Sequence, residues 1–141
     1  MAREVLASIP NNGLCTIDFF GMPEAGSPRP FSRATRAGGL VFVSGASAPH
    51  DPARGIHRGD TPAEQVRNSL AHIAAILEEA GSGLDRVAQM TMLITDPADY
   101  AACNAEYVKH FPNGLPARHT ARFGVPTEAK VAFACIALAG S

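Results

Sequence analysis

The chain has 141 residues, enough for one domain with its own hydrophobic core. Hydrophobic residues make up 46% and charged residues 18%, a composition typical of globular proteins rather than disordered ones. The formal net charge is -1 and no run of Lys and Arg occurs, which disfavours a nucleic-acid partner because such a partner usually requires a basic face. We expect a single domain over residues 1–141.

Three cysteines, Cys15, Cys103 and Cys135, cannot all pair with one another, and none lies in a C-x-x-C motif. This pattern suits a reducing cytoplasm better than a disulfide framework. The N-terminus has an early acid, Glu4, and no long apolar segment, so a secretory signal is not expected. No stretch approaches the roughly 20 apolar residues that span a bilayer. The sequence therefore predicts a cytoplasmic protein with no membrane partner.

Residues 1–30 are rich in turn-forming residues and are expected to be an irregular, atypical N-terminal extension or arm. A short apolar run at 16–20 within this segment fits either an edge strand or a packed arm.

A hairpin is expected next, because residues 32–36 and 40–44 flank the glycine pair at 38–39. Its second strand is rich in β-branched and aromatic residues, which predicts a strand that is buried on both faces. Residues 48–60 contain proline and glycine at several positions and are expected to form a loop.

A helix is predicted over residues 61–80. Thr61 and Glu64 form a capping-box pattern, and Pro62 occupies the first helical position. Gly81 follows the expected end. One apolar stripe runs down this helix at steps of three or four residues: Val66, Leu70, Ile73 and Leu77.

The second half of the chain repeats the strand and helix signals. A strand is predicted over 87–94, and a second helix begins at 96–97, where Asp precedes Pro, and ends before 113–116. Two further strands are expected over 117–123 and 130–138. The second helix is expected to place four side chains in the core: Tyr100, Cys103, Tyr107 and Phe111.

The order of elements indicates an α+β protein with a mixed sheet and both helices on one face. The opposite face of that sheet would carry apolar side chains. An exposed apolar face of this size is rare in a monomer, so the sequence indicates that it is buried by association.

Common catalytic motifs such as a P-loop, G-x-S-x-G or H-E-x-x-H are absent from the sequence, and its five histidines show no metal-ligand spacing with the cysteines. In the expected strand 117–123, Arg118, Thr120 and Arg122 would share one face and His119 the other. A guanidinium beside a hydroxyl suits a carboxylate ligand. Taken alone, however, this pattern fits a surface or interface salt bridge better.

Five motifs occur together in one order, and as a set they are specific. They are PFSRA at 30–34 followed by AGGLVFVSG at 37–45, the helix from Gln65 to Ser82 that ends in EAGS, MTMLITD at 90–96, NAEYVKHF at 104–111, and PAR at 116–118. In these motifs the chain resembles the RidA/YjgF/UK114 family from about Phe31 onward.

The resemblance implies a chorismate-mutase-like fold and a homotrimer with a central β-barrel, helices outside, and ligand clefts between subunits. Many members of the family hydrolyse reactive enamines or imines, such as 2-aminoacrylate, to keto acids and ammonia. The resemblance implies no metal and no organic cofactor.

Individual site residues follow from the same resemblance. Arg118 matches the arginine that binds the substrate carboxylate, and Phe31 stands in place of a pocket tyrosine. Gly45 falls in the glycine turn that borders the cleft, and Asn104 matches an asparagine near the pocket. Thr120 occupies a small polar position from which it would hydrogen-bond ligand or water.

The last strand departs from the family pattern, because Ala132 and Ala134 replace two glutamates, one of which positions the attacking water. General acid–base help is usually worth about 10²–10⁴-fold, so its loss would weaken imine hydrolysis. The two alanines are also expected to leave an apolar recess beside Arg118, which would suit a bulkier acid.

Three functions therefore stay open: an imine or enamine deaminase, a specialised pathway enzyme with a bulkier substrate in the same cleft, and a non-catalytic metabolite-binding trimer. Ribonuclease activity, attached to some relatives, is disfavoured by the near-neutral charge.

Overall fold

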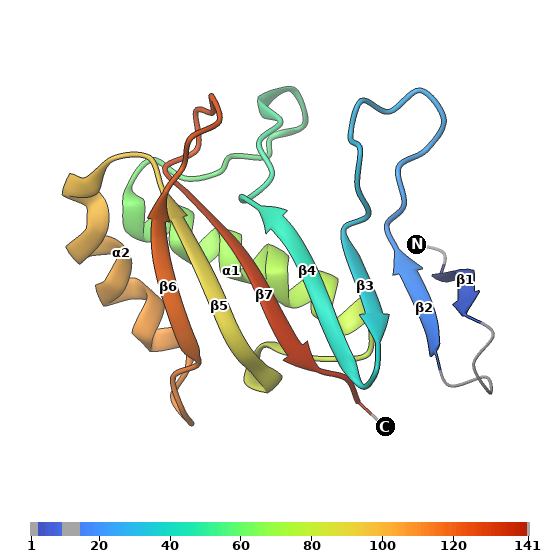
Figure 1. The fold of residues 1–141 in the computed structure, drawn as a ribbon. Helices are drawn as coiled ribbons and strands as arrows, with labels where there is room; N and C mark the ends of the chain where they lie inside the picture. Colours follow the sequence, from blue (N-terminus) through green and yellow to red (C-terminus); the bar gives the residue numbers. More distant parts are fainter. Residues whose placement is uncertain (1–2, 10–14, 141) are drawn as a thin grey trace.

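A computed structural model describes residues 3–9 and 15–140. These described residues form one mixed sheet of seven strands, and their two α-helices cover the same face of it (Figure 1). Across the sheet the strands lie in the order β1-β2-β3-β4-β7-β5-β6, and β5 pairs in parallel with β6. The elements are β1 (Arg3–Ile9), β2 (Cys15–Phe20), β3 (Ala34–Ala37), β4 (Leu40–Ala46), α1 (Pro62–Glu79), β5 (Val87–Ile94), α2 (Tyr100–Tyr107), β6 (Ala117–Arg122) and β7 (Val131–Leu138). The predicted α+β class with a mixed sheet is confirmed.

The N-terminal segment is more regular than the sequence predicts. β1 and β2 pair in antiparallel fashion, and β2 in turn pairs with β3 in a register that sets Phe20 opposite Ala34. The expected irregular segment is therefore wrong for 3–9, because strand pairing extends the sheet through it. The apolar run at 16–20 forms a strand, which was one of its two interpretations, but β1 and β3 flank it, so it does not lie at the edge. Residues 10–14, which also belong to the turn-rich segment, lie outside the described residues.

α1 begins where the capping signals place it. The Thr61 hydroxyl accepts a hydrogen bond from the Glu64 backbone N–H at 3.1 Å and donates one to Glu64 Oε1 at 3.0 Å. Pro62 occupies the first turn, where no N–H is needed. The predicted helix is confirmed, and its apolar stripe is fully buried against the sheet.

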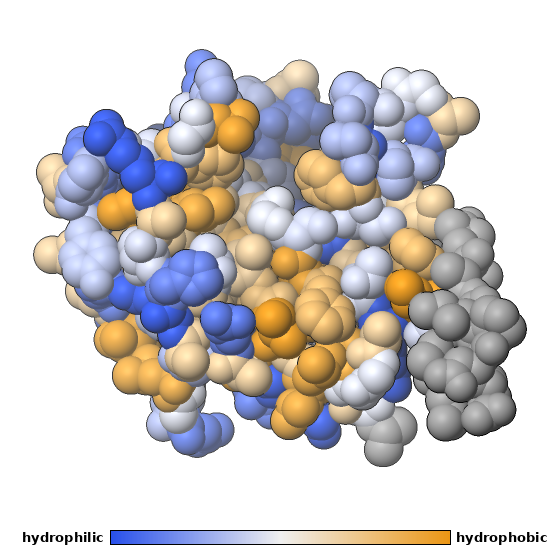
Figure 2. All heavy atoms as spheres, in the orientation of Figure 1, coloured by the Kyte–Doolittle hydropathy of each residue, from blue (hydrophilic) through white to orange (hydrophobic). Residues whose placement is uncertain are grey.

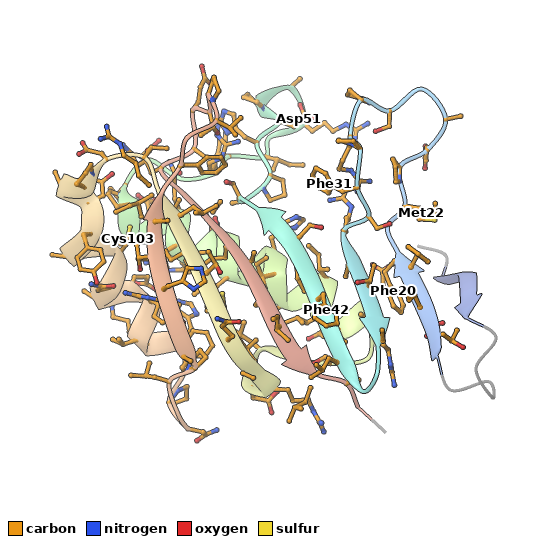
Figure 3. The ribbon with its side chains drawn as sticks, in the orientation of Figure 1. Phe20, Met22, Phe31, Phe42, Asp51 and Cys103 are labelled. Atoms are coloured by element: carbon orange, nitrogen blue, oxygen red, sulfur yellow. The ribbon has the colours of Figure 1, made fainter. Side chains whose placement is uncertain are left out.

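β4 has one buried face and one exposed face. Val41 and Val43 are buried under α1, whereas Phe42 points to the opposite face and is 39% exposed. Figure 3 shows the Phe42 ring standing in front of the sheet, on the side away from the helices. The prediction that this strand is buried on both faces is wrong, because both helices cover the same side.

α2 is a short helix flanked by 3-10 turns at 97–99 and 108–110. Asp96 caps the first turn by accepting from the Ala98 N–H at 2.9 Å. Cys103 and Tyr107 are buried as expected, but Tyr100 is 45% exposed, so its predicted place in the core is wrong. Among the described residues, neither α1 nor α2 is long and apolar enough to cross a bilayer.

The face of the sheet away from the helices, called here the open face, carries exposed apolar side chains. Phe42 and Leu138 are 39% and 52% exposed, and Ile136 between them is partly exposed. Figure 2 views this face and shows hydrophobic residues gathered over β4 and the end of β7. The apolar face expected from the sequence is therefore present.

Candidate functional site

Arg118 lies on the helix-covered face of β6 and is held there by α2. Its Nη2 donates to Asn104 Oδ1 at 2.8 Å, and its guanidinium carbon lies 4.8 Å from the centre of the Tyr107 ring. Nη2 also lies 3.4 Å from the Tyr100 hydroxyl. A charge-assisted hydrogen bond and a cation–π contact together fix the orientation of this cation. The structure thus brings Arg118 and Asn104 together, as the sequence predicts.

A hollow opens beside Arg118 between β6 and the start of α2. Its volume is about 590 Å³, and Thr120 and Arg122 border it from β6. Thr120 lies on the same face as Arg118 because the two are separated by one residue along the strand. Among the described residues that line this hollow, none is an Asp or Glu. The arrangement suits an anionic ligand and offers no carboxylate as a base.

The groups packed around Arg118 are neutral. Burial raises the pKa of Tyr107 to about 12, although the nearby Arg118 opposes the shift. Burial also raises the pKa of the Cys103 thiol, and that of Cys135 to about 12. These thiols therefore stay protonated at neutral pH and are poor nucleophiles. Among the described residues that line the hollow, the charged groups are therefore two cations, Arg118 and Arg122.

Phe31 and Gly45 border a second cavity, of about 520 Å³, at the end of β4. Phe31 is 46% exposed and lies 5.6 Å from the Arg29 guanidinium carbon. A Cβ added to Gly45 would meet nothing within 4 Å, so packing inside the chain does not require glycine there. The free space beside Gly45 leaves room for a ligand or another backbone.

The two parts of the predicted site lie apart within one chain. β7 and β5 separate β4 from β6, and three strand spacings put Gly45 at least about 14 Å from Arg118. A small ligand cannot contact both. The structure therefore groups Arg118, Asn104 and Thr120 in one place and Phe31 with Gly45 in another.

Ala132 and Ala134 lie on the open face, opposite to Arg118. Ala134 pairs with Thr91, and Thr91 Oγ1 lies 3.1 Å from His119 Nε2 on that same face. Arg118 instead pairs with Met90, which is buried under the helices. The expected apolar recess beside Arg118 is therefore wrong for a single chain, whereas the predicted placement of His119 on the face opposite to Arg118 is confirmed.

Sequence reasoning missed three groups that contact Arg118, one of which, Tyr107, was expected only as a core residue. Tyr100 lies one helical turn before Asn104, so the spacing of four residues already places both on one side of α2. Met92 Sδ lies 4.0 Å from Arg118 Nη1, and only the strand register reveals this contact. In the part of the chain that the structure describes, no three His, Cys, Asp or Glu side chains cluster as metal ligands.

Comparison with known proteins identifies the family. The sequence model described as Endoribonuclease L-PSP matches residues 23–139. Protein mmf2, mitochondrial, from Schizosaccharomyces pombe is 35% identical over 112 residues, which cover 77% of this chain and 86% of that protein.

Solved structures agree with this match. NMB1025 from Neisseria meningitidis, a member of the YjgF protein family, superposes with a TM-score of 0.74 at 29% identity, covering 89% of this chain and 96% of its own. RidA from the Antarctic bacterium Psychrobacter sp. PAMC 21119 superposes with a TM-score of 0.68 at 25% identity, covering 80% and 91%. The chain therefore belongs to the Endoribonuclease L-PSP family, the family of the YjgF and RidA proteins.

Proposed function

We propose that this protein is a deaminase-like hydrolase that acts on small imines or enamines bearing a carboxylate, in clefts between the subunits of a homotrimer. The observation that carries the proposal is the Arg118 guanidinium, which Asn104 orients at 2.8 Å beside an open hollow. A fixed guanidinium binds a carboxylate through two parallel hydrogen bonds and so orients the reacting carbon next to it.

The proposed reaction consumes one water for each imine. The enamine first tautomerises to the imine, and water then adds through its oxygen to the imine carbon. The carbon–nitrogen bond breaks, ammonia leaves, and a keto acid remains. Arg118 holds the carboxylate, while Thr120 and backbone groups hold the water. Since no carboxylate lines the hollow among the residues that the structure describes, rate enhancement would come mainly from orientation and from the positive charge.

A second subunit explains why the site residues lie apart in one chain. In the proposed trimer, the part of one subunit with Phe31 and Gly45 faces the part of its neighbour with Arg118. The apolar open face, including Phe42 and Leu138, would be buried in a central barrel. The separation of at least about 14 Å within one chain and the free space at Gly45 both support this assembly.

Ammonia release from enzymatically generated 2-aminoacrylate and a series of other imino acids tests the proposal. Wild type should exceed the uncatalysed rate, and Arg118→Ala should lose most of that excess. Arg86→Ala, which removes an exposed arginine directly before β5, is the matched control and should keep full activity. Full turnover by Arg118→Ala on every substrate would refute the mechanism.

Two other functions are a metabolite-binding trimer without turnover and a pathway enzyme for a bulkier acid. Both are favoured by the absence of Asp and Glu among the described residues of the hollow, together with Ala132 and Ala134. Calorimetric titration with keto acids of increasing size separates these functions. Binding that depends on Arg118 but releases no ammonia from any imino acid would select the binding role.

The family description mentions an endoribonuclease, but a net charge of -1 gives little attraction for RNA phosphates, so we do not adopt that activity. We propose a cytoplasmic location, which Cys103 and Cys135 support because both are free cysteines, as is usual in a reducing compartment. Fractionation of cells that express the tagged chain would test the location.

A further inference from the structure

The cavity of about 520 Å³ that contains Phe31 and Gly45 also carries a group of cations that the proposed reaction does not use. It lies between α1 and the two loops that follow β2 and β4, and both loops project from the same end of the sheet (Figure 1). Phe31 and Asp51, one on each loop, lie at this end (Figure 3). Three arginines line the cavity: Arg29, Arg33 and Arg58.

Backbone carbonyl groups hold two of these arginines. Arg29 Nη1 donates to Gly21 O at 2.9 Å and to Phe31 O at 2.7 Å. Arg58 Nε donates to Ala48 O at 3.1 Å. Each of these bonds uses only one nitrogen of the guanidinium, so the other N–H groups of both arginines remain available to a ligand.

The third arginine, Arg33, packs against Gly21. The φ of +60° at Gly21 favours glycine, and a Cβ at this position would lie 2.7 Å from Cγ and Cδ of Arg33. The Arg33 side chain therefore crosses the loop where only a glycine leaves room. Arg33 makes no side-chain hydrogen bond or ion pair with another described residue, so its donors are also available.

The cavity is electropositive. Among its described lining residues Glu79 is the one acid, and no ion pair joins it to the three arginines. His72 also faces this space, and burial together with the charge of Arg33 lowers its pKa, so it is mostly neutral at pH 7. Half-buried cations that lack carboxylate partners repel one another, and a polyanion would relieve that repulsion.

We propose that this cavity binds the phosphate group of a small organic phosphate. Guanidinium groups match phosphate oxygens through paired hydrogen bonds, and three of them suit a multiply charged group better than a single carboxylate. Phe31 and Ile76 supply apolar surface for the rest of the ligand. Within one chain Arg118 does not line this cavity, so the binding goes beyond the proposed hydrolysis and does not require it.

Calorimetric titration of the full chain with inorganic pyrophosphate, inorganic phosphate and citrate tests the proposal. Pyrophosphate should bind wild type, and Arg33→Gln and Arg58→Gln should each weaken binding by about tenfold or more, the effect of losing one charge-assisted hydrogen bond. Arg54→Gln is the matched control, because Arg54 lies in the same loop as Arg58 but pairs with Asp51 at 3.6 Å outside the cavity.

Arg118→Ala separates this inference from the proposed hydrolysis, because it should abolish ammonia release and still bind pyrophosphate through Arg29, Arg33 and Arg58. Equal affinity in wild type, Arg33→Gln and Arg58→Gln would overturn the site, as would the absence of pyrophosphate binding by wild type. Binding of citrate with no binding of either phosphate probe would overturn the assignment to a phosphate group.

Discussion

Glu106 is a buried carboxylate that joins α2 to α1, and its replacement by Gln should destabilise the chain by about 1–2 kcal/mol at pH 7. Its side chain is only 6% exposed, and its oxygens lie 2.9 Å from His110 Nε2 and 3.5 Å from Arg67 Nε. Lys109 Nζ lies 3.4 Å away. α2 also carries Asn104, which orients Arg118. The contacts of Glu106 that fix α2 against α1 therefore also stabilise the position of Asn104 at the candidate site.

The magnitude follows from the pKa. Hydrogen bonding from His110, then from Arg67 and Lys109, lowers the pKa of Glu106 from 4.5 to about 2, although burial acts in the opposite direction. A shift of that size converts to about 3 kcal/mol as an upper limit. Arg67 and Lys109 are 54% and 69% exposed, so solvent screening reduces their contribution, and about 1–2 kcal/mol remains.

The pH dependence has a definite sign. The pKa is lower in the folded state, so the stabilisation is present above pH 4.5 and is lost as the pH falls toward about 2. Urea unfolding of wild type and Glu106→Gln is followed by circular dichroism at pH 7, 4.5 and 3. The difference in free energy of unfolding between the two proteins should become smaller as the pH falls. Glu78→Gln, an exposed change on α1, is the control. A difference that is absent at pH 7, or that does not change with pH, would refute the reasoning.

Three further substitutions test other contacts. Tyr107→Phe should keep or raise stability, by up to about 1 kcal/mol, because the buried hydroxyl has no hydrogen-bond partner among the described residues; a clear fall in the midpoint of urea unfolding would contradict this. Thr61→Ala should cost about 1 kcal/mol in the same assay through loss of the cap on the Glu64 N–H, and an unchanged midpoint would show that the cap contributes little. The pKa of His72, followed by NMR, should lie below 6.5 and rise in Arg33→Gln, though not fully, because burial is the larger cause. Since the folded state disfavours the proton on His72, stability should fall as the pH drops below 6.5 through this group. An unchanged His72 pKa in Arg33→Gln would place Arg33 away from the cavity.

Local signals in the sequence predicted the elements well, because their causes are local. The Thr61 cap, the proline after it and the stripe of apolar residues specify α1 without reference to the rest of the chain. The shared face of Arg118 and Thr120 follows equally from the alternation of one strand. These predictions needed no knowledge of what lies next to the strand.

The errors concern relations between elements. Ala132 lies on β7 and Arg118 on β6, and which faces they share depends on a register that passes through β5. Phe42 stands among apolar neighbours in the sequence, and only the placement of both helices on one side leaves it exposed. No pattern in the sequence predicted the cavity with Arg29, Arg33 and Arg58. These arginines come from two separate loops, and only the tertiary structure brings the loops together.

The position of β7 and β5 between the two half-sites has a genetic consequence. In the proposed trimer each cleft takes Gly45 from one subunit and Arg118 from the next, so a defect in either half disables only the clefts to which it contributes. Two inactive variants, one altered at each half, should therefore regain part of their activity when they are unfolded together and reassembled. The active clefts would be those that take the Gly45 region from the variant altered near Arg118 and the Arg118 region from the variant altered near Gly45. Alleles of the two classes would then complement each other inside one cell, although both lie in one gene.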